Sequence, residues 1–268
     1  MALMNAHEKM QALKEIIASK GSMLISYSGG VDSALLAVLA TEVLGSNARC
    51  ILLDSPVVPR EAIAEARQIA EEFCLQMKII PVSIMDDERF TKNPAERCYW
   101  CKKKSAKVLQ WIKEALHVAC IADGINVSDT GEHRPGLLAS TEEGIVHPFL
   151  EAGITKADIR EIAKAKGLPF WNKPSAACLS SRIPYGDEIT LKKLDMIEEA
   201  EAFLHTNGFS QYRVRMHGDI ARIEVASKDM QKLVDKREDL VKKFQSIGFT
   251  YVTLDLTGYR SGSMDEVL

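Results

Sequence analysis

A short glycine-containing loop between an apolar run and a helical pattern limits most strongly what this chain can fold into. Residues 23–27 are typical of a β-strand, residues 28–33 read Ser-Gly-Gly-Val-Asp-Ser, and small and apolar residues follow at helical spacing. Glycines let backbone N–H groups approach an anion closely, and the positive end of the helix dipole favours negative charge there. The pattern predicts a strand–loop–helix unit that binds phosphate. The predicted phosphate loop consists of Ser28, Gly29, Gly30, Val31, Asp32 and Ser33.

Asp32 and the absence of a lysine set the expected chemistry of this loop. A carboxylate repels phosphate unless a cation bridges them, so we assign Asp32 to magnesium or to orienting the loop and expect ATP with Mg²⁺. The loop lacks the Gly-Lys-Ser/Thr ending that grips a γ-phosphate. This favours attack at the α-phosphate, with an adenylate and pyrophosphate as products. A plain turn with Asp32 as a helix cap is the alternative interpretation.

Apolar runs and helical patterns alternate from residue 23 to about residue 170, which predicts an α/β fold with a doubly wound parallel sheet. Strands are expected at residues 23–27, 50–53, 78–82, 118–122 and 169–171. Helices are expected at residues 33–44, 60–74, 102–116 and 155–166. Ligands of such sheets bind at the carboxyl ends of the strands. Polar residues that follow the strands are therefore candidates for contacting ATP: Asp54, Gly124, Asn126 and Asp129.

Two candidate features have weaker support. Asp54 is equally compatible with capping a helix. A second segment, from His147 to a charged helix start at Thr155 and Lys156, is also expected to face the cleft.

A change of composition after Pro174 predicts a second, smaller α+β domain. Residues 175–186 are small and without a period, and read as a loop. Beyond them we expect helices at residues 191–205 and 228–247 and strands at 212–216, 220–225 and 250–256. The predicted domains are residues 1–175, which bind ATP, and residues 176–268, which contain Cys178 and several arginines.

The net charge of −3 and the pI near 6.1 provide no bulk attraction to nucleic acid. No apolar run approaches the roughly 20 residues that span a bilayer, and the first residues lack the pattern of an export signal. We therefore expect a cytoplasmic protein with neither a nucleic-acid partner nor a membrane partner.

The six cysteines fall into two groups. Cys50, Cys74 and Cys120 lie in apolar or amphipathic segments and are expected to be structural. Cys98 and Cys101 are separated by two residues, a spacing that suits one metal, one cluster or a redox dithiol, although two surface thiols remain an alternative.

Cys178 lies among small residues and close to Arg182, which makes it a candidate nucleophile. A zinc site would need Cys178 and a histidine such as His133 or His147 beside the pair. Three thiols with one open position better suit a [4Fe–4S] cluster.

The chain resembles the LarE family of ATP-dependent sulfur transferases, which help to make the nickel-pincer nucleotide of lactate racemase. The resemblance covers nearly the whole chain, and its most specific part is Lys-Pro-Ser-Ala-Ala-Cys-Leu-Ser-Ser-Arg-Ile-Pro-Tyr-Gly at residues 173–186. The other matching segments are residues 28–33, 123–129, 134–136, 213–215 and 221–224.

The resemblance implies a reaction and its residues. A carboxylate of pyridinium-3,5-biscarboxylic acid mononucleotide is adenylated and then converted to a thiocarboxylate. In one branch of the family Cys178 would hold a [4Fe–4S] cluster with Cys98 and Cys101, and in the other Cys178 would give up its own sulfur. Because all three cysteines are present, we favour the cluster branch.

The resemblance also implies that residues 176–268 serve sulfur transfer and bind the substrate phosphate. Arg213 and Arg215 alternate along a predicted strand and would bind the substrate phosphate, with Arg182 beside them. A homo-oligomer, a hexamer by resemblance, and a possible sulfide donor are expected as partners.

Three rival functions share parts of this pattern. A tRNA thiolase also joins such a loop with cysteines, but the acidic pI argues against it. An amidotransferase or NAD-synthetase-like enzyme has no need for three converging cysteines. An ATP-binding iron–sulfur sensor or sulfur carrier would bind ATP without releasing pyrophosphate.

Overall fold

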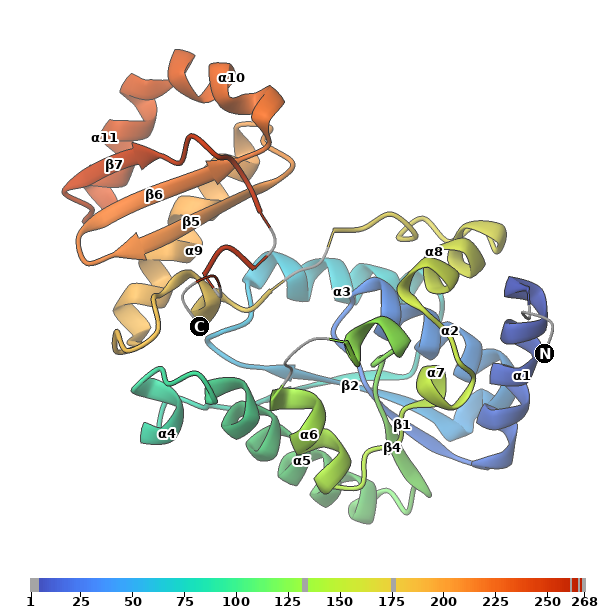
Figure 1. The fold of residues 1–268 in the computed structure, drawn as a ribbon. Helices are drawn as coiled ribbons and strands as arrows, with labels where there is room; N and C mark the ends of the chain where they lie inside the picture. The colour runs from blue at the N-terminus through green and yellow to red at the C-terminus, as the bar shows by residue number, and fades with distance from the viewer. Residues whose placement is uncertain (1–4, 132–134, 175–176, 261, 265, 267–268) are drawn as a thin grey trace. The chain divides into compact units, whose positions relative to one another are not determined.

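A computed structural model describes residues 5–131, 135–174, 177–260, 262–264 and 266 (Figure 1). His133, Arg134, Ser175 and Ala176, which take part in the expectations above, lie outside these residues. Contacts divide the chain into two compact units, Met1–Ile84 with Cys98–Ala176 and Met85–Arg97 with Ala177–Leu268. The second unit thus includes residues 85–97, whereas the sequence placed them in the first domain.

Four parallel strands form the sheet of the first unit, in the order β3-β2-β1-β4. They are β1 (Met23–Ser26), β2 (Ala48–Asp54), β3 (Met77–Pro81) and β4 (Cys120–Ala122). Met23 and Ile25 belong to one core cluster and Leu24 to another, because side chains alternate between the faces of a strand. The sheet therefore has a buried core on each face.

Helices cover both faces of this sheet (Figure 1). They are α1 (Ala6–Ser19), α2 (Val31–Leu44), α3 (Arg60–Glu72), α5 (Arg97–Ala115), α6 (Pro135–Glu142), α7 (Pro148–Glu151) and α8 (Lys156–Ala165), with the short 3-10 helices η1 (Gly45–Asn47) and η2 (Val127–Asp129). Residues of α1, α2, α3 and α8 share one core cluster, while residues of α5 pack into the other with strand residues such as Leu24 and Ile51. The α/β fold with a parallel sheet, as predicted, is confirmed.

The strand expected at residues 169–171 is wrong. These residues form turns, and the next partner of β4 is Val146, which makes an isolated parallel bridge to Ala122. Pro169 has no N–H to donate to a neighbouring strand. The apolar Phe170 is buried in the core, where its ring contacts that of Phe73. The apolar run therefore reflected core packing and not a strand.

Gly29 is required by the geometry of the phosphate loop. Its φ of +69° lies in the left-handed region, and a Cβ there would lie 2.4 Å from Cβ of Ala66 in α3. Any side chain would push the loop away from α3, so only glycine fits.

The second unit is built on a three-stranded sheet in the order β5-β6-β7. Its strands are β5 (Tyr212–His217), β6 (Ile220–Val225) and β7 (Tyr251–Leu254), of which β5 and β6 are antiparallel and β6 and β7 parallel. Its helices are α4 (Glu88–Thr91), α9 (Leu191–Thr206), α10 (Met230–Asp235) and α11 (Arg237–Ile247), with the 3-10 helices η3 (Leu179–Arg182) and η4 (Ser227–Asp229). Residues 85–97 join this unit through hydrogen bonds such as Gly186 N–H to the Asn93 carbonyl, at 2.9 Å.

The helix expected at residues 228–247 is in fact η4, α10 and α11 in succession. Lys236, with φ −95° and ψ 13°, ends α10 and precedes α11. The apolar residues keep helical spacing across this break, so periodicity alone did not reveal it. No helix in the described part of the chain is long and apolar enough to cross a membrane.

The three cysteines expected to be structural differ in burial. Cys50 is fully buried in β2, and this burial raises the pKa of its thiol to about 12. Cys120 is partly buried, whereas Cys74 is exposed beyond the end of α3. Only Cys50 therefore belongs to the interior.

Candidate functional site

The phosphate loop is held by its two serines. The Ser33 hydroxyl lies 3.0 Å from the Ser28 hydroxyl, accepts from the Ser28 N–H at 3.1 Å and donates to the Gly30 carbonyl. Gly30 is the N-cap of α2, and no side chain caps this helix end. Asp32 is the second residue of the helix, so the alternative of a plain Asp32 cap is wrong. The uncapped end presents backbone donors of the kind that bind phosphate.

Asp32 is paired with a lysine from α8. Lys156 Nζ lies 2.7 Å from Oδ1 and 2.6 Å from Oδ2 of Asp32. Burial raises the pKa of Asp32 above its usual value, although the hydrogen bond and charge of Lys156 oppose this rise. The carboxylate assigned to magnesium thus has an ammonium group as its counter-ion in this structure.

The loop after β4 packs directly on the phosphate loop. A Cβ at Gly124 would lie 2.8 Å from the Ser33 backbone nitrogen and 2.9 Å from Asp32 Cβ, so glycine allows the close approach. Asn126 is buried and donates from its side chain to Asp129 Oδ2 at 2.8 Å, in a capping box of η2. Gly124 therefore borders the predicted ATP site, whereas Asn126 and Asp129 shape the loop.

Asp54 lies at the end of β2 and accepts from Arg60 Nη1 at 2.6 Å. The N-cap of α3 is Pro59, so Asp54 does not cap that helix. Its side chain is held at the carboxyl edge of the sheet, where the sequence placed it.

A buried acid–histidine pair is the main feature of this edge that the sequence did not assign. Asp123 directly follows β4 and accepts from His147 Nδ1 at 2.7 Å, from Lys102 Nζ at 3.1 Å and from the Ser140 hydroxyl at 3.2 Å. Burial alone would raise the pKa of Asp123, but His147 and Lys102 lower it below its usual value. Lys102 belongs to α5, so its contact with Asp123 fixes the helix that carries Cys98 and Cys101 to the edge of the sheet.

Cys98 and Cys101 lie within the first two turns of α5, which begins earlier than expected, at Arg97. Residues three apart are neighbours on a helix surface, so the two thiols share one side of α5. Cys98 is exposed and Cys101 is partly exposed. The intervening Tyr99 donates to Glu142 Oε2 of α6 at 2.6 Å, which fixes this turn.

Cys178 precedes η3 in the second unit and is partly exposed. Its Sγ lies 3.0 Å from the hydroxyl of the fully buried Ser180. Its carbonyl accepts from Arg182 Nη1 at 2.9 Å and from the Ser181 hydroxyl at 2.8 Å. The loop that carries the thiol is therefore fixed by hydrogen bonds to its backbone carbonyl.

Within the described residues, no group of three or more histidine, cysteine or acidic side chains gathers at metal-binding distance. The thiols of Cys98 and Cys101 suit two ligand positions of an iron–sulfur cluster, and Cys178 belongs to the other unit.

Arg182, which was expected to contact the substrate, forms its hydrogen bonds with other groups of the protein. Its Nε and Nη2 each donate to one oxygen of Glu201 at 3.0 Å, and Nη1 donates to backbone carbonyls of the Cys178 loop. Arg182 is 2% exposed. Glu201 Oε1 also accepts from the Val214 N–H of β5. This arginine positions the loop of Cys178 against the sheet.

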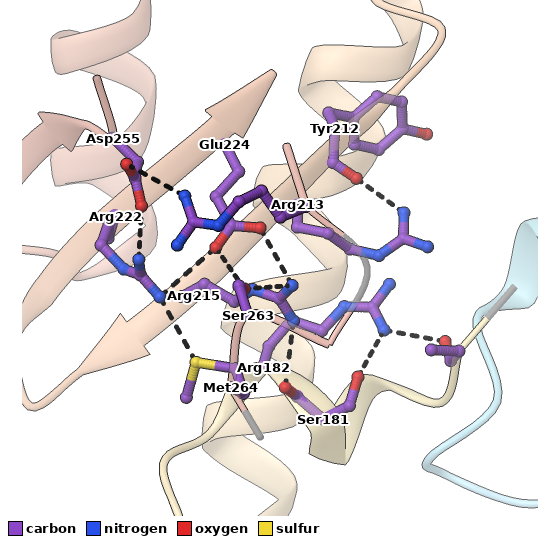
Figure 2. Close-up of polar contacts among 12 residues, drawn as sticks. Ser181, Arg182, Tyr212, Arg213, Arg215, Arg222, Glu224, Asp255, Ser263 and Met264 are labelled. Atoms are coloured by element: carbon purple, nitrogen blue, oxygen red, sulfur yellow. Dashed lines mark hydrogen bonds and ion pairs between the residues drawn. The ribbon is translucent and has the colours of Figure 1, made fainter. Parts of the chain in front are cut away.

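Arg213 and Arg215 lie on one face of β5, as the alternation predicted (Figure 2). Arg215 Nη2 donates to Glu224 Oε2 at 2.9 Å, and its Nη1 donates to the Ser181 carbonyl. Arg213 lies over the ring of Tyr259, 5.3 Å from its centroid. Burial, reinforced by the charge of Arg182, lowers the pKa of Arg213, as expected where several guanidinium groups are close together.

Removing Glu201 is expected to destabilise the second unit strongly. Glu201→Ala leaves the buried Arg182 without a counter-ion, which costs about 3–5 kcal/mol of the free energy of unfolding. Urea denaturation followed by circular dichroism measures the change. Glu199→Ala, on the same helix, removes an exposed ion pair with Lys243 and should cost less than about 1 kcal/mol. Equal effects of the two substitutions would contradict the structural role of Glu201.

Comparison with known proteins places these features in a family. The model of the NAD synthase family matches residues 6–103, which include the phosphate loop. The chain is 40% identical to an uncharacterized protein of Synechocystis sp., over 97% of this chain and 98% of the relative. It is 34% identical to the pyridinium-3,5-bisthiocarboxylic acid mononucleotide synthase of Lactiplantibacillus plantarum, over 91% of this chain and 89% of that enzyme. The chain belongs to this synthase family.

Membership of the synthase family extends over both units. A protein of Methanocaldococcus jannaschii is also 36% identical, over 93% of this chain and 94% of its own length. The recognition of the LarE family from the sequence is confirmed, and the chain is an enzyme of an ATP-using family, as predicted.

Proposed function

We propose that this member of the synthase family is an ATP-dependent sulfur transferase acting on pyridinium-3,5-biscarboxylic acid mononucleotide. The observation that carries the proposal is the 34% identity with the Lactiplantibacillus plantarum synthase, which spans both the phosphate loop and the Cys178 loop. The two sites have complementary chemistry, because one presents anion-binding donors and the other a thiol beside several arginines.

The phosphate loop supports the first half of the reaction. A substrate carboxylate oxygen attacks the α-phosphorus of ATP, the bond to the β-phosphate oxygen breaks, and pyrophosphate leaves. Backbone donors at the start of α2 and the hydroxyls of Ser28 and Ser33 would hold the phosphates. Mg²⁺, which accompanies ATP in this proposal, would neutralise phosphate charge, while Asp32, kept in its ion pair with Lys156, would orient the loop.

The second half of the reaction is assigned to Cys178. A sulfur nucleophile attacks the acyl carbon of the adenylate and expels AMP, so that a thiocarboxylate forms. Arg213 and Arg215 would bind the substrate phosphate, because guanidinium groups form paired, charge-assisted hydrogen bonds with phosphate oxygens. Arg182 keeps the Cys178 loop in place for this attack.

Two sources of the sulfur remain as forms of the proposal. In the form favoured by the sequence, Cys98, Cys101 and Cys178 would hold a [4Fe–4S] cluster, which would supply sulfide obtained from a donor. In the other form, the Cys178 Cβ–Sγ bond breaks after thioester formation, an α-proton is lost, and dehydroalanine remains.

An iron and sulfide analysis separates the two forms. The protein is purified without oxygen, and iron, acid-labile sulfide and the absorption spectrum are measured for the wild type and for Cys98→Ala, Cys101→Ala and Cys178→Ala. About four irons per chain, lost in each variant, identify the cluster form. The second form predicts no iron after anaerobic reconstitution, and a wild-type chain that is lighter by one H₂S after turnover. Iron bound equally by all three variants would contradict ligation by these thiols.

Three broader expectations accompany the proposal: cytoplasmic location, a homo-oligomer with a hexamer as the predicted form, and a separate sulfide donor. Light scattering of the purified protein tests the oligomer.

A further inference from the structure

Three described residues beyond β7, namely Tyr259, Ser263 and Met264, lie against arginines of the second unit. The Tyr259 N–H donates to the Val225 carbonyl at the end of β6, which brings the chain alongside the sheet. Ser263 and Met264 are both buried. We call these three residues the cover.

Ser263 lies between two buried charged side chains, Arg215 and Glu224 (Figure 2). Its hydroxyl donates to Glu224 Oε1 at 2.7 Å and accepts from Arg215 Nη2 at 3.0 Å. Arg215 and Glu224 are 5% and 0% exposed. Since Arg213 also lies over the ring of Tyr259, the cover contacts both arginines assigned to the substrate phosphate.

The donors beneath the cover are incompletely used. Arg215 Nε is buried and has no hydrogen-bond acceptor. Arg222 Nη2 has the thioether sulfur of Met264 at 3.4 Å, a weak acceptor, and Glu224 Oε1 at 3.3 Å. A buried guanidinium donor without an acceptor is costly, and a protein normally avoids it. Arg215 Nε therefore indicates a ligand with an acceptor that the cover does not supply.

We propose that the cover is a displaceable lid over the arginine site, and that it opens when the phosphate of the nucleotide substrate binds. Phosphate oxygens are charged acceptors and replace the neutral hydroxyl of Ser263 and the thioether of Met264 with stronger hydrogen bonds. The lid keeps the arginines paired with protein groups until a phosphate arrives. This inference rests on the proposed function, because that function supplies the phosphate-bearing substrate.

Hydrogen–deuterium exchange of the full-length protein tests the lid directly. The probe is nicotinic acid mononucleotide, which carries a pyridinium ring, a carboxylate and a phosphate. We expect the probe to increase deuterium uptake in the peptide that contains Tyr259 and Ser263. Reduced uptake would show that the cover closes onto the ligand, and would overturn the proposal.

Binding measurements provide a second test. A lid that is closed nine-tenths of the time weakens apparent affinity about tenfold, so truncation after Arg260 should lower the Kd of the probe by about that factor. Ser263→Ala removes the contacts with Arg215 and Glu224 from the intact chain and should lower the Kd by a smaller factor. Ser246→Ala, a matched change on the exposed face of α11, should leave the Kd unchanged. Weaker binding by both lid variants would make Ser263 a part of the phosphate site and overturn the lid.

Arg213→Ala separates the lid from the function on which it rests. If this substitution weakens probe binding while truncation and Ser263→Ala change nothing, the phosphate site stands and the lid fails. If no variant binds the probe, both proposals fail. Tighter binding by the truncated chain that Arg213→Ala reverses is the result expected when both are correct.

Discussion

Cys178→Ser is expected to abolish thiocarboxylate formation, by at least about 10³-fold, while ATP-dependent pyrophosphate release continues. Both forms of the proposed sulfur transfer need this sulfur, and a serine oxygen can neither deliver sulfur nor replace a thiolate ligand. Pyrophosphate release depends on the phosphate loop, which lies in the other unit. Pyrophosphate is measured by a coupled assay, and the thiocarboxylate by mass spectrometry of the nucleotide product.

Cys74→Ser is the matched control, because Cys74 is exposed and lies outside both sites. It should leave both products unchanged. Sulfur transfer by Cys178→Ser at the wild-type rate would remove Cys178 from the mechanism. Cys98→Ser and Cys101→Ser distinguish the two sulfur sources, since they abolish transfer only if a cluster carries the sulfur.

Local sequence signals predicted the sheet of the first unit well, because each buried parallel strand forms a short apolar run. The same signal failed at residues 169–171, where the run serves core packing by Phe170 and not pairing. It also failed at Lys236, where a break in the helix leaves the apolar spacing intact. Periodicity reports which side chains are buried, and backbone pairing has to be inferred from it.

Site residues were predictable where they are contiguous. The phosphate loop is one such segment, and its Gly29 and Gly124 are explained by close backbone approach. Partnerships across the chain were not predictable, since Lys156 and Asp32 are 124 residues apart and Asp123 and His147 are 24 apart. The sequence noted Lys156 and His147 only as polar groups near the cleft. Tertiary folding alone assigns them to particular carboxylates.

Lys156→Met is expected to lower kcat/KM for pyrophosphate formation by about 10²-fold or more, the cost typical of losing one charge-stabilising donor in an active site. Lys156 Nζ contacts both oxygens of Asp32, and Asp32 is part of the loop that would hold the phosphates. Without the ammonium group, a partly buried carboxylate faces the incoming phosphates with its charge unbalanced, and repulsion weakens ATP binding. Titration calorimetry with α,β-methylene ATP measures the binding loss without turnover.

A second substitution tests whether charge balance is the reason. Asp32→Asn combined with Lys156→Met removes the repelling carboxylate as well, so the double variant should bind α,β-methylene ATP more tightly than Lys156→Met alone. Lys166→Met, at the other end of α8, breaks the ion pair with Glu42 and should leave nucleotide binding unchanged. A double variant no better than Lys156→Met would show that Lys156 acts on the phosphates themselves, and that neutralising Asp32 is not its main role. Wild-type binding by Lys156→Met would mean that Asp32 needs no counter-ion from the protein once Mg²⁺ and ATP are present.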